Sequence, residues 1–346
     1  MATPYYTHSA MTGAPQLSAS ARAIPDILAA VLVNGFNTLA PSSATAASGV
    51  LTLNFGSAHG YEALAHIEIS GASVAEANGV HRVATVPAGN QLTCAIPGIA
   101  DGSVGGTIST KVAAAGWTEP FAANSTTRVF RMGGGNQRYL RIVHAASSAA
   151  LARGYESMTA LSTGTGPFPT VAQIGGSGDV FGNASSSDPT HSWWALSTES
   201  GMYMQIFDSG VSSLGAAFFG DLAEAVKAAD AFSTLLIGSL GSQGYIARSH
   251  TGSAGAVAAL PGTFGTSLAT PSPIADGQRF LYGVPVEADT ALRGLLPGGF
   301  SALPPCDLDQ SGVVIADVTN IDGRAIHWIP NGSYGYIALA IDEDLA

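Results

Sequence analysis

The sequence predicts a mainly β protein whose main domain is a β-sandwich or barrel. Short runs of apolar and β-branched residues recur about every ten residues along most of the chain, and Gly, Asn or Pro separates nearly all of them. Residues 66–70 (HIEIS) alternate with the period of two that is typical of a half-buried strand. A βαβ architecture would need a helix of about 10–15 residues between strands, and the chain lacks that repeating pattern.

One segment, residues 22–33 (RAIPDILAAVLV), predicts a short N-terminal helix. Pro25 stands near its first turn, and Asn34-Gly35 supplies a left-handed stop after it. The apolar residues that share one helical face are Ile24, Ile27, Leu28, Val31 and Leu32. We expect this face to pack on a sheet or on a neighbouring subunit.

Residues 47–112 predict a small inserted β-barrel-like domain. Five strand-like runs occur there within fewer than seventy residues: VLTLNF, HIEIS, HRVATV, LTCAI and GTISTKV. The flanking segments LVNGFNTLAP and AAAGWTEPF look like one surface interrupted by an insertion. The predicted organisation is an arm and helix in residues 1–46, the inserted domain in 47–112, and the main β-rich domain in 113–346.

The part that follows the inserted domain continues the β pattern with runs such as RVFRM, RYLRIVH, HSWWALS, GMYMQIF, STLLIGSL and YGYIALAI. The Gly-rich stretch at residues 133–136 lies between two of these runs and predicts a hairpin connection. Residues 221–232 (DLAEAVKAADAF) fit a helical face and fit a strand that runs into a turn, and we favour a short helix or turn.

Composition excludes several classes of protein. The net charge is −11, and no basic stripe is present that could neutralise phosphates, which argues against nucleic-acid binding. No apolar window reaches the ~18 residues of a spanning helix, and the start lacks the pattern of a secretory signal, so we expect no membrane insertion and synthesis in the cytoplasm. Charged residues are only 11 % of the chain. This low share favours an assembly subunit whose surface is covered by neighbouring subunits. The alternative is a GC-rich source, which raises the share of Ala and Gly.

The motifs of common catalytic and cofactor sites are missing. No G-x-S-x-G elbow is present, and no Gly-rich stretch continues into Gly-Lys-Ser/Thr. Cys94 and Cys306 predict small buried side chains rather than a disulfide framework. Of eight scattered histidines, His66 and His81 come nearest to a pair, and solvent-facing or hydrogen-bonded histidines are the more common outcome. The sequence therefore predicts no catalytic residues, no cofactor and no enzymatic role.

Residues 306–312 (CDLDQSG) resemble the start of a calcium loop, with Asp307, Asp309 and Ser311 at alternate positions before a glycine. Val318 stands at the twelfth position, where such a loop needs a bidentate glutamate. An Asx-type turn is therefore the favoured interpretation, and no metal site is predicted.

Two further groups are candidates for contacts with other molecules. Trp193 or Trp194, with nearby Asp188, could contact a host glycan, although alternation puts the two indoles on opposite faces and core packing is the simpler interpretation. The N-terminal lead carries four apolar residues that are suited to docking on a neighbour, or that belong to a frayed terminus: Tyr5, Tyr6, Met11 and Leu17.

Several short segments of the sequence resemble segments of tailed-bacteriophage virion structural proteins of the tail or tail-associated kind. They are SAMTGAP, LVNGF, GWTEPF, RGYESMTALSTGTGPFPT and FFGDL, and the segment SAHGYEALAHIEISGA resembles a small β-domain that recurs in phage tail and fibre proteins. Residues 62–65 (EALA) depart from that pattern, in which a turn glycine is usual. The resemblance implies a β-rich virion subunit that assembles with itself and with other virion proteins, and it transfers no enzymatic residue. A receptor-binding fibre or adhesin module and a capsid decoration protein are the alternatives, and a depolymerase is the least favoured.

Overall fold

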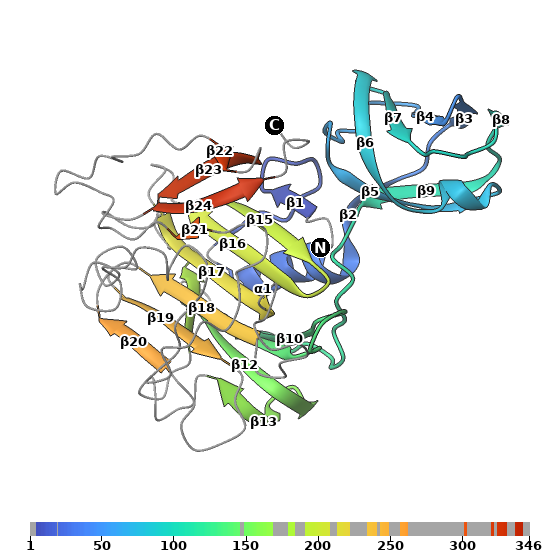
Figure 1. Cartoon of the computed structure of the whole chain (residues 1–346). Coiled ribbons are helices and arrows are strands. Elements are labelled where there is room, and N and C mark those ends of the chain that lie inside the picture. Colours follow the sequence, from blue (N-terminus) through green and yellow to red (C-terminus); the bar gives the residue numbers. More distant parts are fainter. Residues whose placement is uncertain are drawn as a thin grey trace.

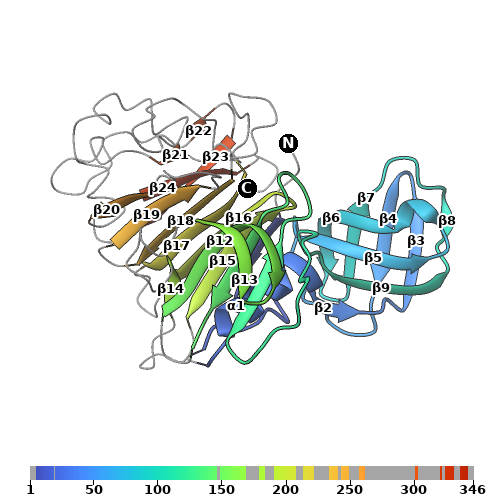
Figure 2. The same cartoon turned by 90° about the horizontal axis from the view of Figure 1, so that it is seen from below.

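The structure is a computed structural model. It describes residues 5–18, 20–145, 149–168, 179–183, 191–207, 213–221, 234–240, 243–248, 257–261, 301–302, 320–321, 324–330 and 336–341. The chain is mainly β, as the sequence predicts. It forms a larger body and, from residues 36–112, a module that stands to one side of the body in both orthogonal views (Figures 1 and 2).

The predicted helix is confirmed over residues 23–34. It consists of α1 (Ala23–Ala29) and a π-helical turn, η1 (Ala30–Asn34), that continues it. The predicted apolar face is buried in the core, with exposed fractions of 0–1 % for Ile24, Ile27, Leu28, Val31 and Leu32. Gly35 ends the helix with φ of 70°.

The module is a single curled sheet of eight antiparallel strands around its own apolar residues. All five predicted strands are present, and the sheet also includes two strands that begin before residue 47, the predicted start of the inserted domain. The division into domains stays a prediction. The elements of the module are β2 (Phe36–Leu39), β3 (Ser43–Ala47), β4 (Val50–Asn54), β5 (His66–Ala72), the 3₁₀ turn η2 (Ala75–Ala77), β6 (Gly79–Ala88), β7 (Gln91–Ala95), β8 (Gly102–Ser103) and β9 (Gly106–Val112), and their order in the sheet is β2-β9-β5-β6-β7-β4-β3-β8.

The largest sheet of the body has seven antiparallel strands and begins with the N-terminal strand at one edge. Residues 5–8 therefore belong to a sheet of the body, where they pair with residues 194–197. In spatial order the strands are β1 (Tyr5–His8), β15 (Ser192–Thr198), β16 (Gly201–Phe207), β17 (Ser213–Asp221), β18 (Thr234–Leu240), β19 (Gln243–Arg248) and β20 (Val257–Pro261).

A second sheet of the body contains β10 (Thr127–Arg131), β11 (Tyr139–Val143), β12 (Ala149–Ala160), β13 (Thr163–Phe168) and β14 (Asp179–Asn183). The predicted hairpin at residues 133–136 is confirmed, because β10 and β11 pair antiparallel across that loop. Residues from both sheets and α1 share one core, in which Phe168 stacks on Phe219 at 6.0 Å between ring centroids. Trp117 meets the same Phe219 ring edge-on at 5.9 Å.

A third, four-stranded sheet closes the described part of the chain. It consists of β21 (Ser301–Ala302), β24 (Tyr336–Ile341), β23 (Arg324–Pro330) and β22 (Asn320–Ile321), in that spatial order. The segment for which we favour a helix or turn lies outside the described residues from position 222 onward. Within the described residues, no helix is both long enough and apolar enough to cross a membrane.

Candidate functional site

The chain crosses between body and module twice, and both crossings are tied to the helix. After β9, the backbone N–H of Ala115 donates to the carbonyl of Val31 at 3.0 Å, and that of Trp117 donates to Leu32 at 2.9 Å. Before β2, Gly35 passes so close to β9 that a Cβ there would lie 2.3 Å from the carbonyl oxygen of Val112. The two segments that flank the module thus lie side by side on the end of the helix.

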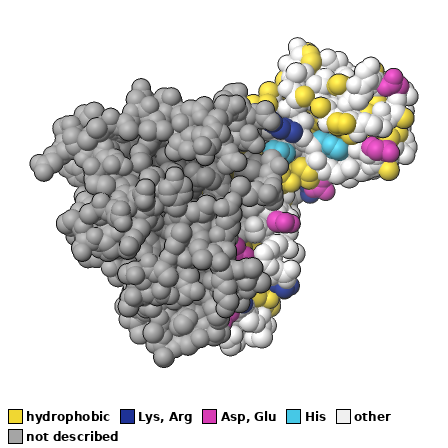
Figure 3. All heavy atoms as spheres, in the orientation of Figure 1, with side chains coloured by type: hydrophobic (Ala, Val, Ile, Leu, Met, Phe, Trp, Pro, Cys, Tyr) yellow, Lys and Arg dark blue, Asp and Glu magenta, His cyan; other side chains and the backbone are white. Residues whose placement is uncertain are grey.

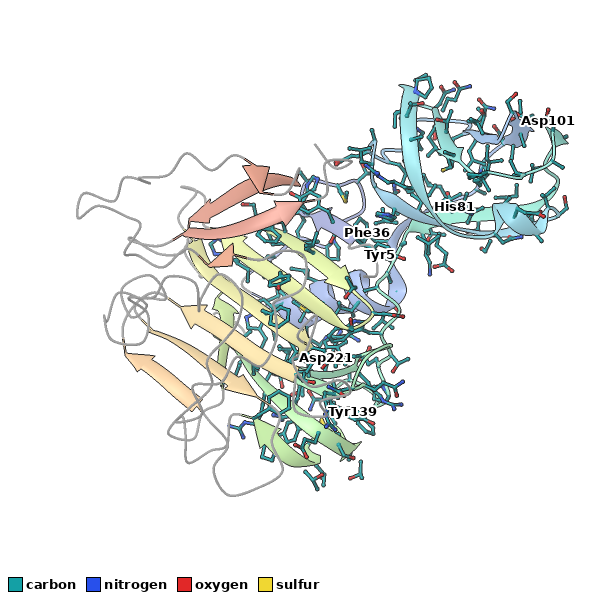
Figure 4. The ribbon with its side chains drawn as sticks, viewed as in Figure 1. Tyr5, Phe36, His81, Asp101, Tyr139 and Asp221 are labelled. Carbon is teal, nitrogen blue, oxygen red and sulfur yellow. The ribbon has the colours of Figure 1, made fainter. Side chains whose placement is uncertain are left out.

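A ring contact joins the edge strand of the body to the module. Tyr5, on β1, stacks on His66, on β5, with 4.6 Å between the ring centroids and 30° between the ring planes. Figure 4 shows Tyr5 and Phe36 at the place where the body meets the module, on the side of the module where His81 lies. Burial raises the pKa of the Tyr5 phenol, and the carboxylates of Glu199 and Glu68 raise it further.

His66 is held in the neutral form at this contact. Its side chain is 9 % exposed, and Arg82 stands directly opposite it in the pairing of β5 with β6. Burial, and secondarily the charge of Arg82, lower the pKa of His66 to about 4, because both disfavour a second positive charge there. The imidazole is therefore an apolar stacking partner for Tyr5 at neutral pH.

Polar contacts surround this stack at the surface. His8 Nε2 lies 2.9 Å from a carboxylate oxygen of Glu62, and Lys111 Nζ lies 3.0 Å from Glu68 and donates to the Asn34 carbonyl at 2.9 Å. The side chains of Lys111 and Glu68 are 30 % and 40 % exposed, so their ion pair contributes at most about 1 kcal/mol. Figure 3 shows His side chains in the part of the module nearest to the body, and no single-sign patch on the visible face of the module.

Of the four residues predicted to dock on a neighbour, Tyr5 contacts the module, Tyr6 packs on rings of the body, and two do not reach the surface. Tyr6 lies 6.4 Å from Trp194 and 5.5 Å from His8 between ring centroids. Met11 is 5 % exposed and Leu17 is 0 % exposed, so both are already covered by the core of their own chain. Both belong to the core of the body because β1 pairs with β15, which places the segment that follows β1 on the body.

The candidate glycan contacts are separated in the structure. Trp193 is 1 % exposed and donates from its indole to the Pro15 carbonyl at 2.9 Å, so it is a core residue. Trp194 points to the other face of β15, as alternation predicts, and is half-buried beside Tyr6. Asp188, the calcium-loop candidates Asp307, Asp309 and Ser311, and Cys306 lie outside the described residues.

The two histidines considered as a pair are not brought together. His66 faces Arg82 across the strand pair, whereas His81 faces Ile67, so the two imidazoles lie on opposite faces. Cys94 is fully buried, as predicted, and burial raises the pKa of its thiol to about 12. Within the described residues, no group of three or more His, Cys, Asp or Glu is arranged to hold a metal ion.

Sequence reasoning missed Asp221, which fixes the Gly-rich loop of the body. Its carboxylate accepts the backbone N–H of Asn136 at 2.6 Å and the Asn136 side-chain amide at 3.2 Å, and it also accepts the hydroxyl of Thr234. A Cβ on Gly135 would collide with this carboxylate. No local signal could have revealed the contact, since 85 residues separate Asp221 from Asn136.

Comparison with known proteins finds a weak likeness among solved structures. No protein-family model and no curated protein sequence matches the chain. Among solved structures, the chain is similar to a phage phi92 endosialidase at 11 % identity, with a TM-score of 0.20 over 61 % of this chain. The match spans 39 % of the length of that protein, so the chain corresponds to well under half of it.

The predicted lack of an enzymatic role is contradicted by this comparison, because the neighbour is an enzyme by its name. We therefore withdraw that prediction. The likeness assigns no reaction, substrate or catalytic residue to this chain.

Proposed function

We propose that the protein is a tail-associated component of a phage particle that presents the module of residues 36–112 beside an anchored β body. The resemblance of several short sequence segments to tailed-phage virion proteins supports the phage assignment. The architecture supports the role in presentation, since a small curled sheet stands beside a larger body and joins it through only two chain segments (Figure 1).

The observation that carries the proposal is the way in which the junction is fixed. Both crossing segments lie against the helix through backbone contacts, and the Tyr5–His66 stack adds a third attachment from an edge strand. A module on a flexible tether would need none of these contacts. A module that must meet a neighbouring subunit or a receptor in one orientation benefits from all three, because a preorganised surface loses less entropy on binding.

Self-assembly and contact with other virion proteins are part of the proposal. The chain has only two lysines, Lys111 and Lys227, in 346 residues, and Lys and Glu are the residues that interfaces disfavour. The outer edge of β1, the first strand in its sheet, is available for strand pairing in the described chain. A subunit of this kind would be found in the virion.

An epitope tag at the end of the module remote from the body tests the proposal. Figure 4 shows Asp101 at that end, and residues 100–103 are exposed, so a short epitope inserted between Ala100 and Asp101 leaves the core untouched. Tagged particles are first checked by mass spectrometry for the chain and are then labelled with gold-conjugated antibody. Untagged particles are the control.

Gold along the tail or at its tip is the expected result. Gold over the head would assign the chain to capsid decoration and overturn the tail placement. Absence of the chain from purified particles, given a tagged protein that the antibody recognises in its folded form, would overturn the virion proposal altogether.

A further inference from the structure

Three arginines lie on one face of the sheet that contains β10, β11 and β12. Strand pairing places Val129, Arg141 and Arg153 in one row, and Arg131 opposite Tyr139 in the next. Since directly opposite residues share a face, Arg131, Arg141 and Arg153 point to the same side from three successive strands. The side chains of all three are partly exposed.

This arrangement is costly in the isolated chain. Arg141 and Arg153 are directly opposite each other, and like charges in that position destabilise a strand pair. Within the described residues, none of the three arginines forms an ion pair with a carboxylate. The Nε atoms of Arg131 and Arg153 are buried without a hydrogen-bond partner, which is rare for such groups.

The opposite face of the same sheet shows how the chain treats an arginine that has a structural role. Arg128 lies 2.6 Å from a carboxylate oxygen of Glu119 and 2.8 Å from one of Asp26, so two acids neutralise it. Two of the three arginines of the other face have neutral partners. Arg141 donates from Nε to the Leu161 carbonyl at 3.0 Å, and Arg131 contacts Gln137 and lies over the Tyr139 ring at 5.6 Å.

A small apolar cluster lies among these guanidinium groups. It consists of Val129, Tyr155 and Met158, with Phe121, Tyr139 and Leu161 packed against it. Apolar surroundings lower the local dielectric constant, and an anion bound at the arginines would therefore be attracted more strongly than at a fully hydrated site. Figure 4 shows Tyr139 beside the strands of this sheet, at the border of the body.

We propose that this face of β10, β11 and β12 binds a carboxylated polysaccharide through Arg131, Arg141 and Arg153. Guanidinium groups bind carboxylates with paired, charge-assisted hydrogen bonds. Neighbouring strands are about 4.8 Å apart, close to the length of one sugar unit, so Arg141 and Arg153, which lie directly opposite each other, match acidic groups on successive sugars. The Tyr139 ring beside them offers an apolar surface for the C–H face of a sugar.

A nucleic acid fits this face less well. Binding to a phosphate backbone strengthens with each cation that contacts it, and three arginines in a chain of net charge −11 supply few. Bases would also need several exposed aromatic platforms, and Tyr155, the second tyrosine of this face, is only 8 % exposed. The proposal concerns the isolated chain and does not depend on its place in a particle.

Titration of the full chain with oligogalacturonate, followed by calorimetry, tests the proposal. Neutral dextran of equal length and single-stranded DNA are the comparison ligands. We expect R141Q/R153Q to weaken oligogalacturonate binding at least tenfold and R153Q alone severalfold. R22Q is the matched control for R153Q, since it removes one positive charge from an arginine that already pairs with Asp26, and we expect a change of less than twofold.

Unfolding of the same variants separates a binding role from a structural one. R141Q/R153Q should melt at the temperature of the parent chain or above it, because the substitutions remove a like-charge pair. R141K/R153K keeps the charge but loses the paired hydrogen bonds, so its affinity should fall between those of the parent and of R141Q/R153Q. Failure of the parent to bind oligogalacturonate, equal binding of dextran, tighter binding of DNA, or equal losses in R153Q and R22Q would each overturn the proposal.

Discussion

The ring of Tyr5 stacks on the imidazole of His66 at 4.6 Å between centroids, although the two residues lie 61 positions apart in the sequence. Tyr5 belongs to the edge strand of the seven-stranded sheet of the body, and His66 begins the strand β5 of the module. The contact therefore links two parts of the chain whose backbones join only at the helix end. Its strength decides how firmly the module keeps its orientation.

Removal of the Tyr5 ring should loosen the junction. Tyr5→Ala is expected to lower the free energy of unfolding by about 1–2 kcal/mol, since stacked ring pairs contribute about 0.5–1.5 kcal/mol beyond the area that they bury. Tyr5→Phe keeps the ring and is the matched control, with an expected loss under about 0.5 kcal/mol. Chemical denaturation measures both values, and small-angle scattering should show a broader distribution of module positions for Tyr5→Ala alone. Identical scattering curves for the two variants would contradict this account of the junction.

The stability of the chain should depend on pH through His66. Its pKa is about 4 in the folded chain and 6.5 in an unfolded one, so between these values the unfolded state binds more protons. Stability from this group is thus complete above pH 6.5 and falls as the pH drops toward 4, by on the order of 1–3 kcal/mol.

His66→Gln should flatten the dependence of the unfolding free energy on pH between 6.5 and 4. His81→Gln, on the neighbouring strand, leaves the Tyr5 contact in place and is the control that should keep the slope of the parent. Denaturation curves at half-unit pH intervals measure the difference. An unchanged slope in His66→Gln would show that another group governs the acid response.

The helix end tolerates only glycine at position 35. Gly35 has φ of 70°, and a Cβ there would lie 2.3 Å from the backbone oxygen of Val112, which cannot move away as a side chain could. Gly35→Ala should therefore destabilise the chain by about 2–4 kcal/mol. Gly56→Ala is the control, since a Cβ there meets nothing within 4 Å and φ is not positive, and its effect should be within about 0.5 kcal/mol. Equal melting temperatures for the two variants would rule out the close approach.

The sequence predicts the elements of this protein better than their contacts. The helix was recognisable because Ile24, Ile27 and Leu28 repeat at helical spacing, and β5 was recognisable because residues 66–70 alternate. The strands β3 (SATAA) and β12 (AALARGYESMTA) were missed, since Ala, Ser and Gly carry little β propensity and these strands depend on pairing with neighbours.

The junction and the arginine face could be predicted only in part. Tyr5 and Tyr6 stand out as apolar residues in a polar N-terminal segment. That pattern suggests that they make a contact, but it does not identify the partner. Met11 stands out in the same way and is buried in the core of its own chain, because the local pattern does not reveal which segment packs beside a sheet edge. The three arginines are spread over 23 positions, and only the register of β10, β11 and β12 places them on one face.

Asp221 should prove to be the residue that orders the Gly-rich loop of the body. Its carboxylate uses both oxygens, accepting the Asn136 backbone and side-chain amides and the Thr234 hydroxyl. Asp221→Asn leaves one acceptor oxygen and adds donors that face the Asn136 amides, so we expect a loss of about 1–3 kcal/mol of unfolding free energy.

Hydrogen exchange reports on the loop directly. The backbone amide of Asn136 should be protected in the parent and should exchange at least tenfold faster in Asp221→Asn, because its acceptor at 2.6 Å is impaired. Asp101→Asn is the matched control: Asp101 also accepts one backbone amide, that of Ser48 at 2.7 Å, but from an exposed turn of the module. It should cost less than about 1 kcal/mol and leave Asn136 unchanged. Slow exchange of Asn136 in Asp221→Asn would mean that the glycines and the strand ends hold the loop without the carboxylate.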